Sequence, residues 1–109
     1  MLTGKNKEQF EKFYADEFQQ GNFYKLGWFY GLPLSMQFGV VVDYADSIGY
    51  DVNAFKSLND DMNGYVYISS VNDNCVDDTH KTRDEARLSA IKAFDEIVNR
   101  DTRKVKHKK

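Results

Sequence analysis

Residues 64–97, GYVYISSVNDNCVDDTHKTRDEARLSAIKAFDEI, carry the pattern that decides the fold. The first eight, GYVYISSV (64–71), are rich in tyrosine, valine and isoleucine, which favour a β-strand. The cluster NDN at 72–74 predicts a tight turn, and CVDDTH at 75–80 can return as the antiparallel partner. This stretch therefore predicts a β-hairpin followed by a further element.

That further element is a helix with a clear start. Thr82 and Glu85 form a T-x-x-E capping box, in which each side chain satisfies a backbone N–H at the helix start. Apolar residues then recur at helical spacing. They are Ala86, Ala90, Ala93, Phe94 and Ile97, with Leu88, Ile91 and Val98 widening the same face. Because alanines dominate this face, we expect the helix to approach a sheet closely.

The N-terminal half predicts two helices. Residues 6–19 carry an apolar stripe that ends before Gly21, with aromatic residues three and four positions apart. Apolar residues also repeat every four positions from Met36 to Ile48, which favours a helix with Ser35 as N-cap and Gly49 as C′ residue. The run Val40-Val41-Val42 favours a strand instead, because β-branched side chains prefer a pleated surface. We prefer the helix, since a short strand would not supply four periodic positions.

These elements assemble into one α+β domain. YDVNAF at 50–55 alternates apolar and polar residues and can form a first strand, and NDDMNG at 59–64 is loop material. The predicted order is α-α-β-β-β-α over residues 1–99, with the helices packed on one face of a small antiparallel sheet. Residues 100–109 form a basic tail that we expect to be disordered.

The net charge of −2 is unevenly distributed along the chain. Residues 100–109 contain six basic residues and one acid, so the nine basic and sixteen acidic residues of 1–99 leave that part at −7. Since nucleic-acid affinity comes largely from neutralised phosphates, an acidic body is poorly suited to it. The tail could bind polyanions by itself, through side chains that include Arg103, Lys104 and Lys106.

Several classes of protein and of chemistry find little support. The single cysteine, Cys75, excludes an internal disulfide, no apolar run approaches ~20 residues, and the N-terminus lacks the apolar region of a signal peptide. We therefore expect a cytoplasmic protein without a membrane partner. No zinc-ligand spacing, phosphate-binding loop or nucleophile elbow is present, so we expect no cofactor, no metal and no catalytic residue. A hydrolase with a carboxylate pair stays open, since the acids allow many spatial pairs.

Aromatic residues crowd into NFYKLGWFY (22–30), which matches neither a clean helix nor an alternating strand. If the rings are packed, they add heavily to the core; if some are exposed, they can anchor a protein partner. Stacking on single-stranded bases is a third use, with one lysine to support it. The predicted partner-binding residues are Tyr24, Trp28, Phe29 and Tyr30.

In residue types, the segment 64–97 is similar to the second half of double-stranded-RNA-binding domains. Those domains end in a hairpin and a helix that opens K-K-x-A-K, and RDEAR (83–87) occupies that position here. The resemblance implies phosphate contacts by Lys81, Arg83 and Arg87. An aspartate replaces the central lysine, and the family's G-P-x-H loop has no counterpart.

A second resemblance covers residues 32–99. LPLSMQFGVVVDYADSIGYDV (32–52) and KTRDEARLSAIKAFDEIVN (81–99) resemble small uncharacterised proteins carried by phages and mobile elements of gut bacteria. The resemblance implies a kind of genome, not a reaction. The function that we expect is therefore a non-enzymatic accessory protein that binds a host macromolecule, for example a protein inhibitor of a host defence system. The alternative is a nucleic-acid-binding module.

Overall fold

The computed structural model describes residues 2–18, 26–59 and 64–107. The elements are α1 (Gly4–Phe18), α2 (Leu26–Tyr30), α3 (Leu34–Ser47), β1 (Val52–Asn59), β2 (Gly64–Val71), β3 (Asn74–His80) and α4 (Arg83–His107). The predicted α+β class and antiparallel sheet are confirmed. The structure adds the short helix α2, which lies in the segment expected to be irregular.

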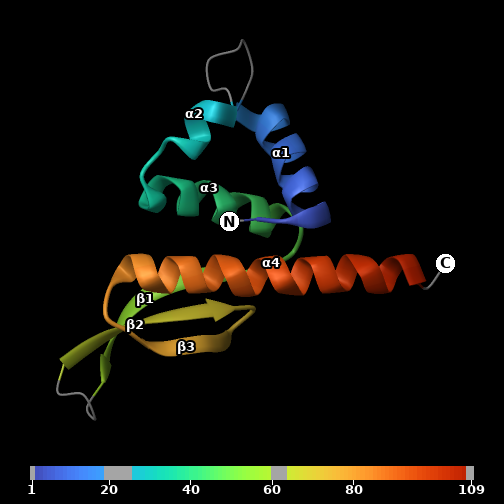
Figure 1. Cartoon of the computed structure of the whole chain (residues 1–109). Helices are drawn as coiled ribbons and strands as arrows, with labels where there is room; N and C mark the ends of the chain where they lie inside the picture. The colour runs from blue at the N-terminus through green and yellow to red at the C-terminus, as the bar shows by residue number, and fades with distance from the viewer. Residues whose placement is uncertain (1, 19–25, 60–63, 108–109) are drawn as a thin grey trace.

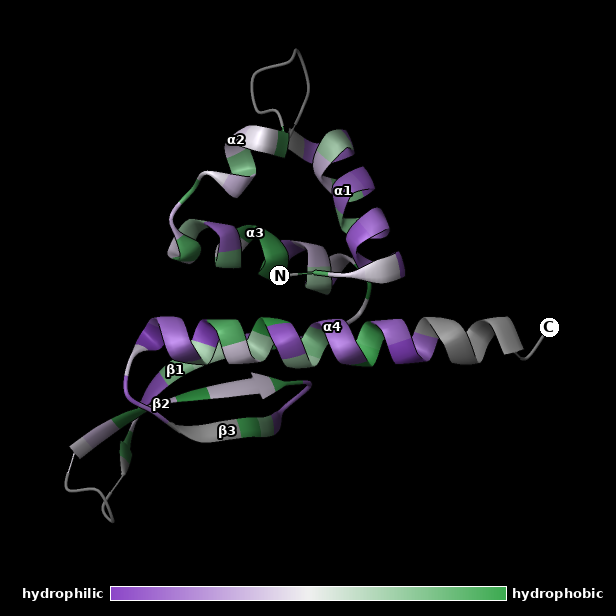
Figure 2. Cartoon of the chain, in the orientation of Figure 1, coloured by the Kyte–Doolittle hydropathy of each residue, from purple (hydrophilic) through white to green (hydrophobic). Residues whose placement is uncertain are grey.

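Helix α4 lies between two layers (Figure 1). One side of α4 packs on all three strands, and its other side packs on α1 and α3. The helices therefore do cover one face of the sheet, as expected, but α4 supplies most of the cover and α1 and α3 rest on α4. Figure 2 shows α3 as the most hydrophobic helix, whereas α1 and α4 are hydrophilic ribbons interrupted by apolar residues.

The sheet has the strand order β1-β2-β3, with both pairs antiparallel. The first pair is in regular register from Val52 opposite Val71 to Asn59 opposite Gly64. Between β2 and β3, Asn72 and Asp73 have φ values of 53° and 66°. Two successive positive φ values define the two-residue hairpin turn that matches strand twist, and Asn and Asp tolerate them. The turn predicted from NDN is confirmed.

The core is built around aromatic rings from four helices. Phe10, Tyr14, Phe29, Tyr44 and Phe94 are each at most 1% exposed. The ring centroid of Phe10 lies 5.1 Å from that of Phe29 and 5.4 Å from that of Tyr44, and Tyr44 lies 6.0 Å from Phe94. These tilted and edge-on pairs join α1 to α2, α1 to α3, and α3 to α4. Tilted and edge-on contacts suit the charge distribution of aromatic rings.

The close approach of α4 to the sheet follows from its alanines. Ala86 and Ala90 are fully buried, and Phe94 continues the same side of the helix. Leu88, expected to widen this face, is instead 53% exposed. At 100° per residue Leu88 lies well away from Ala86 and Ala90, so the face is narrower than the list of apolar residues suggested.

Helix α3 confirms the helical interpretation of residues 35–49 and ends as predicted. Gly49 has a φ of +88°, its N–H donates to Asp46 O at 3.1 Å, and the Tyr50 N–H donates to Ala45 O at 2.8 Å. This is the Schellman arrangement, which needs a left-handed residue at C′. The prediction for the start was wrong: the helix begins at Leu34, and Pro33 occupies the N-cap position without a side-chain hydrogen bond.

Helix α4 continues into the basic segment for which we expected disorder. Its described bounds extend to His107, so residues 100–107 are helical in the structure. Neither Gly nor Pro interrupts the sequence between Arg83 and His107, so nothing in the residue types breaks the helix there.

Candidate partner-binding surface

Helix α2 divides its aromatic residues between the core and the surface. Phe29 is fully buried and its ring centroid lies 5.1 Å from Phe10 and 5.3 Å from Tyr14. Adjacent residues of a helix point about 100° apart, so burial of Phe29 turns its two neighbours outward. Trp28 is 47% exposed and Tyr30 is 42% exposed. The fourth residue of this set, Tyr24, lies outside the described residues.

Tyr30 is held in a fixed orientation although it is exposed. Its hydroxyl donates to Glu11 Oε2 at 3.1 Å, and its ring meets Phe29 edge-on with centroids 5.1 Å apart. Partial burial, together with the hydrogen bond and the charge of Glu11, raises the pKa of Tyr30 to about 12. The hydroxyl therefore stays protonated at neutral pH and presents a neutral, amphipathic ring to solvent.

The chain turns from α2 into α3 directly after these rings. The Gln37 side chain donates to Leu32 O at 2.8 Å and to Tyr30 O at 3.3 Å, which ties the turn to the first part of α3. Met36, in the same part of α3, is 52% exposed. We refer to Trp28, Tyr30 and Met36 as the α2–α3 corner. Ring surface, a flexible thioether and one polar tip are the chemistry of protein-contact surfaces.

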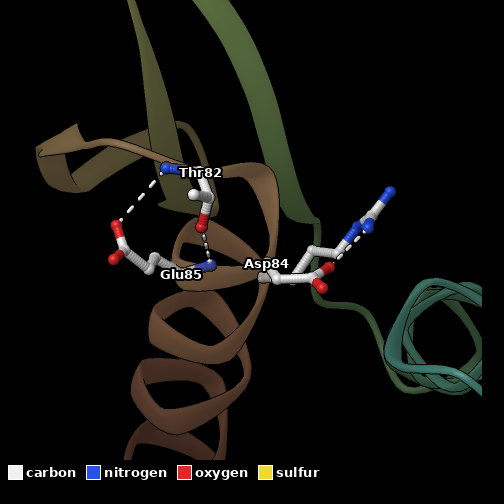
Figure 3. A network of polar contacts seen from close by, with 4 residues as sticks. Thr82, Asp84 and Glu85 are labelled. Carbon is white, nitrogen blue, oxygen red and sulfur yellow. Dashed lines mark hydrogen bonds and ion pairs between the residues drawn. The ribbon is translucent and has the colours of Figure 1, made fainter.

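The start of α4 is built as the sequence predicted. Glu85 N–H donates to Thr82 Oγ1 at 3.2 Å, and Thr82 N–H donates to Glu85 Oε2 at 3.3 Å, which completes the capping box (Figure 3). The same carboxylate oxygen accepts the Lys81 N–H at 2.9 Å. A negative side chain thus already sits against the positive end of the helix.

The side chains that the RNA-binding resemblance singles out are only partly available for phosphate. Arg87 Nη1 lies 2.7 Å from Asp84 Oδ1, so this guanidinium has a carboxylate partner (Figure 3). Arg83 lies over the Tyr67 ring, 5.4 Å from its centroid, and Lys81 is exposed. These positions remain predicted contacts.

The basic residues near the end of α4 lie far from Lys81, Arg83 and Arg87. Arg103, Lys104 and Lys106 lie in the last turns of α4, where the structure describes the backbone alone. They follow Arg83 by twenty residues or more, which is about 30 Å along a helix. The two basic groups therefore do not form one compact site.

A polar cluster joins α1 to α4 around the buried side chains of Asp95 and Asn6. Asp95, 5% exposed, accepts hydrogen bonds from Thr3 N at 3.0 Å, Thr3 Oγ1 at 2.6 Å and Asn6 Nδ2 at 2.9 Å. Asn99 Oδ1 accepts the Asn6 N–H at 3.0 Å, and the Tyr44 hydroxyl donates to Asn6 Oδ1 at 2.7 Å. Side chains of α4 thus satisfy N–H groups at the start of α1.

This cluster has the character of a structural joint and not of a catalytic site. The Asp95 carboxylate already accepts several donors, and among the described residues no other carboxylate takes part in the hydrogen bonds of this cluster. General acid–base work by paired carboxylates therefore finds no support here. Sequence reasoning missed the cluster, because nothing local marks Asp95 or Asn99 as the partners of residues near the N-terminus.

A serine–histidine contact lies between the sheet and α4. Ser69 Oγ is 3.3 Å from His80 Nε2 and 3.3 Å from Ser89 Oγ, but Ser69 is fully buried. A substrate could not reach that hydroxyl, so we assign the contact to packing. Cys75 pairs with Ser70, whereas His80 pairs with Tyr67, three residues away on β2. The cysteine and histidine therefore lie on opposite faces of the sheet.

Within residues 2–18, 26–59 and 64–107, no cluster of His, Cys, Asp or Glu side chains is suited to hold a metal ion. Across the same residues, none of the helices combines the length and the apolar character that crossing a bilayer requires.

A second group of aromatic and basic side chains was not anticipated. Lys56 Nζ lies 4.7 Å from the Tyr65 ring centroid on the neighbouring strand, close to the Arg83–Tyr67 pair. The signal that could have revealed it is Y-V-Y at 65–67, since residues two apart on a strand share one face.

Comparison of the chain with protein-family models, with curated proteins and with solved structures finds no match in any of the three.

Proposed function

We propose that this protein is a non-enzymatic binding module that recognises a protein partner through the α2–α3 corner. The observation that carries the proposal is the contrast between neighbours in α2: Phe29 is fully buried, whereas Trp28 is 47% exposed. A buried anchor holds the helix in place, so Trp28 is presented on a rigid support. Tryptophan and tyrosine on such supports contribute much of the binding energy of protein interfaces.

The resemblance to proteins of phages and mobile elements makes a host protein the expected partner. The −7 charge of residues 1–99 supports one concrete version, an inhibitor that imitates nucleic-acid charge and blocks a host defence nuclease. In that version binding weakens as salt is raised, because exposed charges are screened. Binding that does not respond to salt would exclude this version and leave an apolar contact at the corner.

The test compares what the immobilised full chain retains from host proteins with what its variants retain. Trp28→Ala should remain folded and lose the partner, because it removes the exposed anchor and leaves Phe29 in the core. Leu58→Ala, which truncates an apolar residue 63% exposed on β1, is the matched control and should retain the partner. Circular dichroism melting checks that each variant is folded.

Two results would contradict the proposal. Unfolding of Trp28→Ala would assign this ring to the core instead of an interface. Equal retention of the same protein by Trp28→Ala and by the unaltered chain would place the contact elsewhere on the molecule.

A further inference from the structure

The far end of the β1–β2 hairpin reaches past the first turn of α4 (Figure 1). Tyr65 on β2 is 65% exposed and Leu58 on β1 is 63% exposed. At the other end of the same two strands, Val52 and Val71 lie in the core. In the sheet register Leu58 is opposite Tyr65, and Lys56 is opposite Tyr67. Cross-strand partners and residues two apart share a face, so all four side chains lie on the face of the sheet that α4 covers further along.

Each of the two tyrosine rings lies next to a basic side chain. Lys56 Nζ lies 4.7 Å from the Tyr65 ring centroid, and the Arg83 guanidinium carbon lies 5.4 Å from the Tyr67 ring centroid. Both distances are within the range of cation–π attraction. We call Lys56, Tyr65, Tyr67 and Arg83 the tyrosine–cation face.

The nearby carboxylates of α4 are already engaged. Glu85 accepts the backbone N–H groups of Lys81 and Thr82, and Asp84 pairs with Arg87. In the part of the chain that the structure describes, no ion pair involves Lys56 or Arg83. Their positive charge is therefore available to an anion, in contrast to that of Arg87.

From this arrangement we propose that the tyrosine–cation face binds single-stranded nucleic acid. Side chains two residues apart on a strand are separated by about 6.6 Å, so two successive unstacked bases can each meet one ring. Single-strand binders combine aromatic stacking platforms with basic side chains that meet the phosphates. A duplex cannot use the two rings in this way, because its bases are already stacked on one another.

This activity goes beyond the protein-binding function proposed above and uses a different surface. Three residues of the tyrosine–cation face lie on β1 and β2 and the fourth, Arg83, begins α4, whereas the α2–α3 corner lies in the helical layer on the other side of α4 (Figure 1). Loss of one activity therefore leaves the other measurable.

The experiment is a fluorescence-anisotropy titration of a labelled single-stranded 15-nucleotide pyrimidine oligonucleotide (a length of about one single-strand site) and of its duplex, using the full chain. We expect the single strand to bind more tightly than the duplex. Tyr65→Ala should weaken single-strand binding by about tenfold or more, because it removes one stacking platform, whereas Tyr65→Phe should retain it. Lys56→Gln and Arg83→Gln should each reduce the slope of log K against log salt concentration by about one, because each removes one phosphate contact.

Leu58→Ala is the matched control, because Leu58 faces Tyr65 across the strands and offers neither a ring nor a charge. The triple variant Arg103→Gln, Lys104→Gln, Lys106→Gln tests whether basic residues late in α4 are responsible. The proposal is overturned if Tyr65→Ala binds as tightly as the unaltered chain, if the duplex binds more tightly than the single strand, or if only the triple variant loses binding. Absence of any binding at low salt would also overturn it.

Discussion

Tyr44 shows how much one buried hydroxyl determines in this molecule. The residue is 1% exposed and donates to Asn6 Oδ1 at 2.7 Å, so it links α3 to the start of α1. Burial, and after it the negative charge of Asp95, raises the pKa of Tyr44 to about 12. The pKa values of Tyr30 and Tyr50 are also raised to about 12, by burial first and then by their hydrogen bonds to Glu11 and Asp101.

These raised pKa values predict a loss of stability at high pH. Below pH about 10 the tyrosines are protonated in both the folded and the unfolded chain, so the free energy of unfolding does not depend on them. Between about pH 10 and 12 the unfolded chain releases protons that the folded chain keeps, and stability falls. We expect the melting temperature to decline over this range and to decline less steeply in Tyr44→Phe.

At pH 7 the free energy of unfolding of Tyr44→Phe should be lower by about 1–3 kcal/mol, because Asn6 Oδ1 would be left buried without the Tyr44 donor. Thermal melting of both proteins from pH 7 to pH 12 measures both effects. Parallel profiles for the two proteins above pH 10 would show that Tyr44 does not titrate as expected.

At the scale of elements, the signals that sequence analysis used correctly are local ones. The capping box at Thr82, the left-handed residue at Gly49 and the turn at Asn72 each depend on neighbours a few residues away. Ser35 failed as an N-cap because Pro33, with a φ of −56°, starts the helix two residues earlier. Helix α2 was missed because five residues are too few for a periodic pattern, and packing of Phe29 among distant rings holds it.

Two glycines, one inside α3 and one just after its end, allow a matched test of this local account. Gly49 has a φ of +88°, so Gly49→Ala should destabilise by about 1–2 kcal/mol through strain in the left-handed region. Gly39 lies inside the helix and an added Cβ would meet no atom within 4 Å, so Gly39→Ala should stabilise by up to about 1 kcal/mol. Urea unfolding of the two variants should give changes of opposite sign. Equal changes would contradict the assignment of Gly49 as the C′ residue.

At the scale of the whole molecule, the fold class and part of the α2–α3 corner could be predicted from the sequence, but the tyrosine–cation face could not. Periodicity and turn residues give the order of elements, because each reflects local geometry. Which side of α2 is exposed depends on where Phe10 and Tyr14 lie, and the Lys56–Tyr65 pairing depends on strand register. Both are tertiary facts, so Trp28 and Phe29 were grouped together and Tyr65 was not selected.

The joint between α1 and α4 carries a prediction at this scale. Asp95→Ala would leave the side chain and N–H of Thr3 and the amide of Asn6 without their acceptor, and we expect a loss of about 1–3 kcal/mol or more. Because this acceptor lies at the start of α1, amide hydrogen exchange should rise first in that helix. Glu96→Ala removes an exposed carboxylate from the next position and should change little. Uniform exchange along the chain in Asp95→Ala would argue against a local joint.

This joint also bears on how the chain folds while it is being made. The acceptors for Thr3 and Asn6 follow them by 92 and 93 residues. At about 5–20 residues per second, the ribosome adds those acceptors some 5–20 seconds after the start of α1. During that interval the first amides of α1 can bond only to water, and an isolated helix of 15 residues is marginal. The helix that is synthesised first is therefore completed only when α4 reaches it.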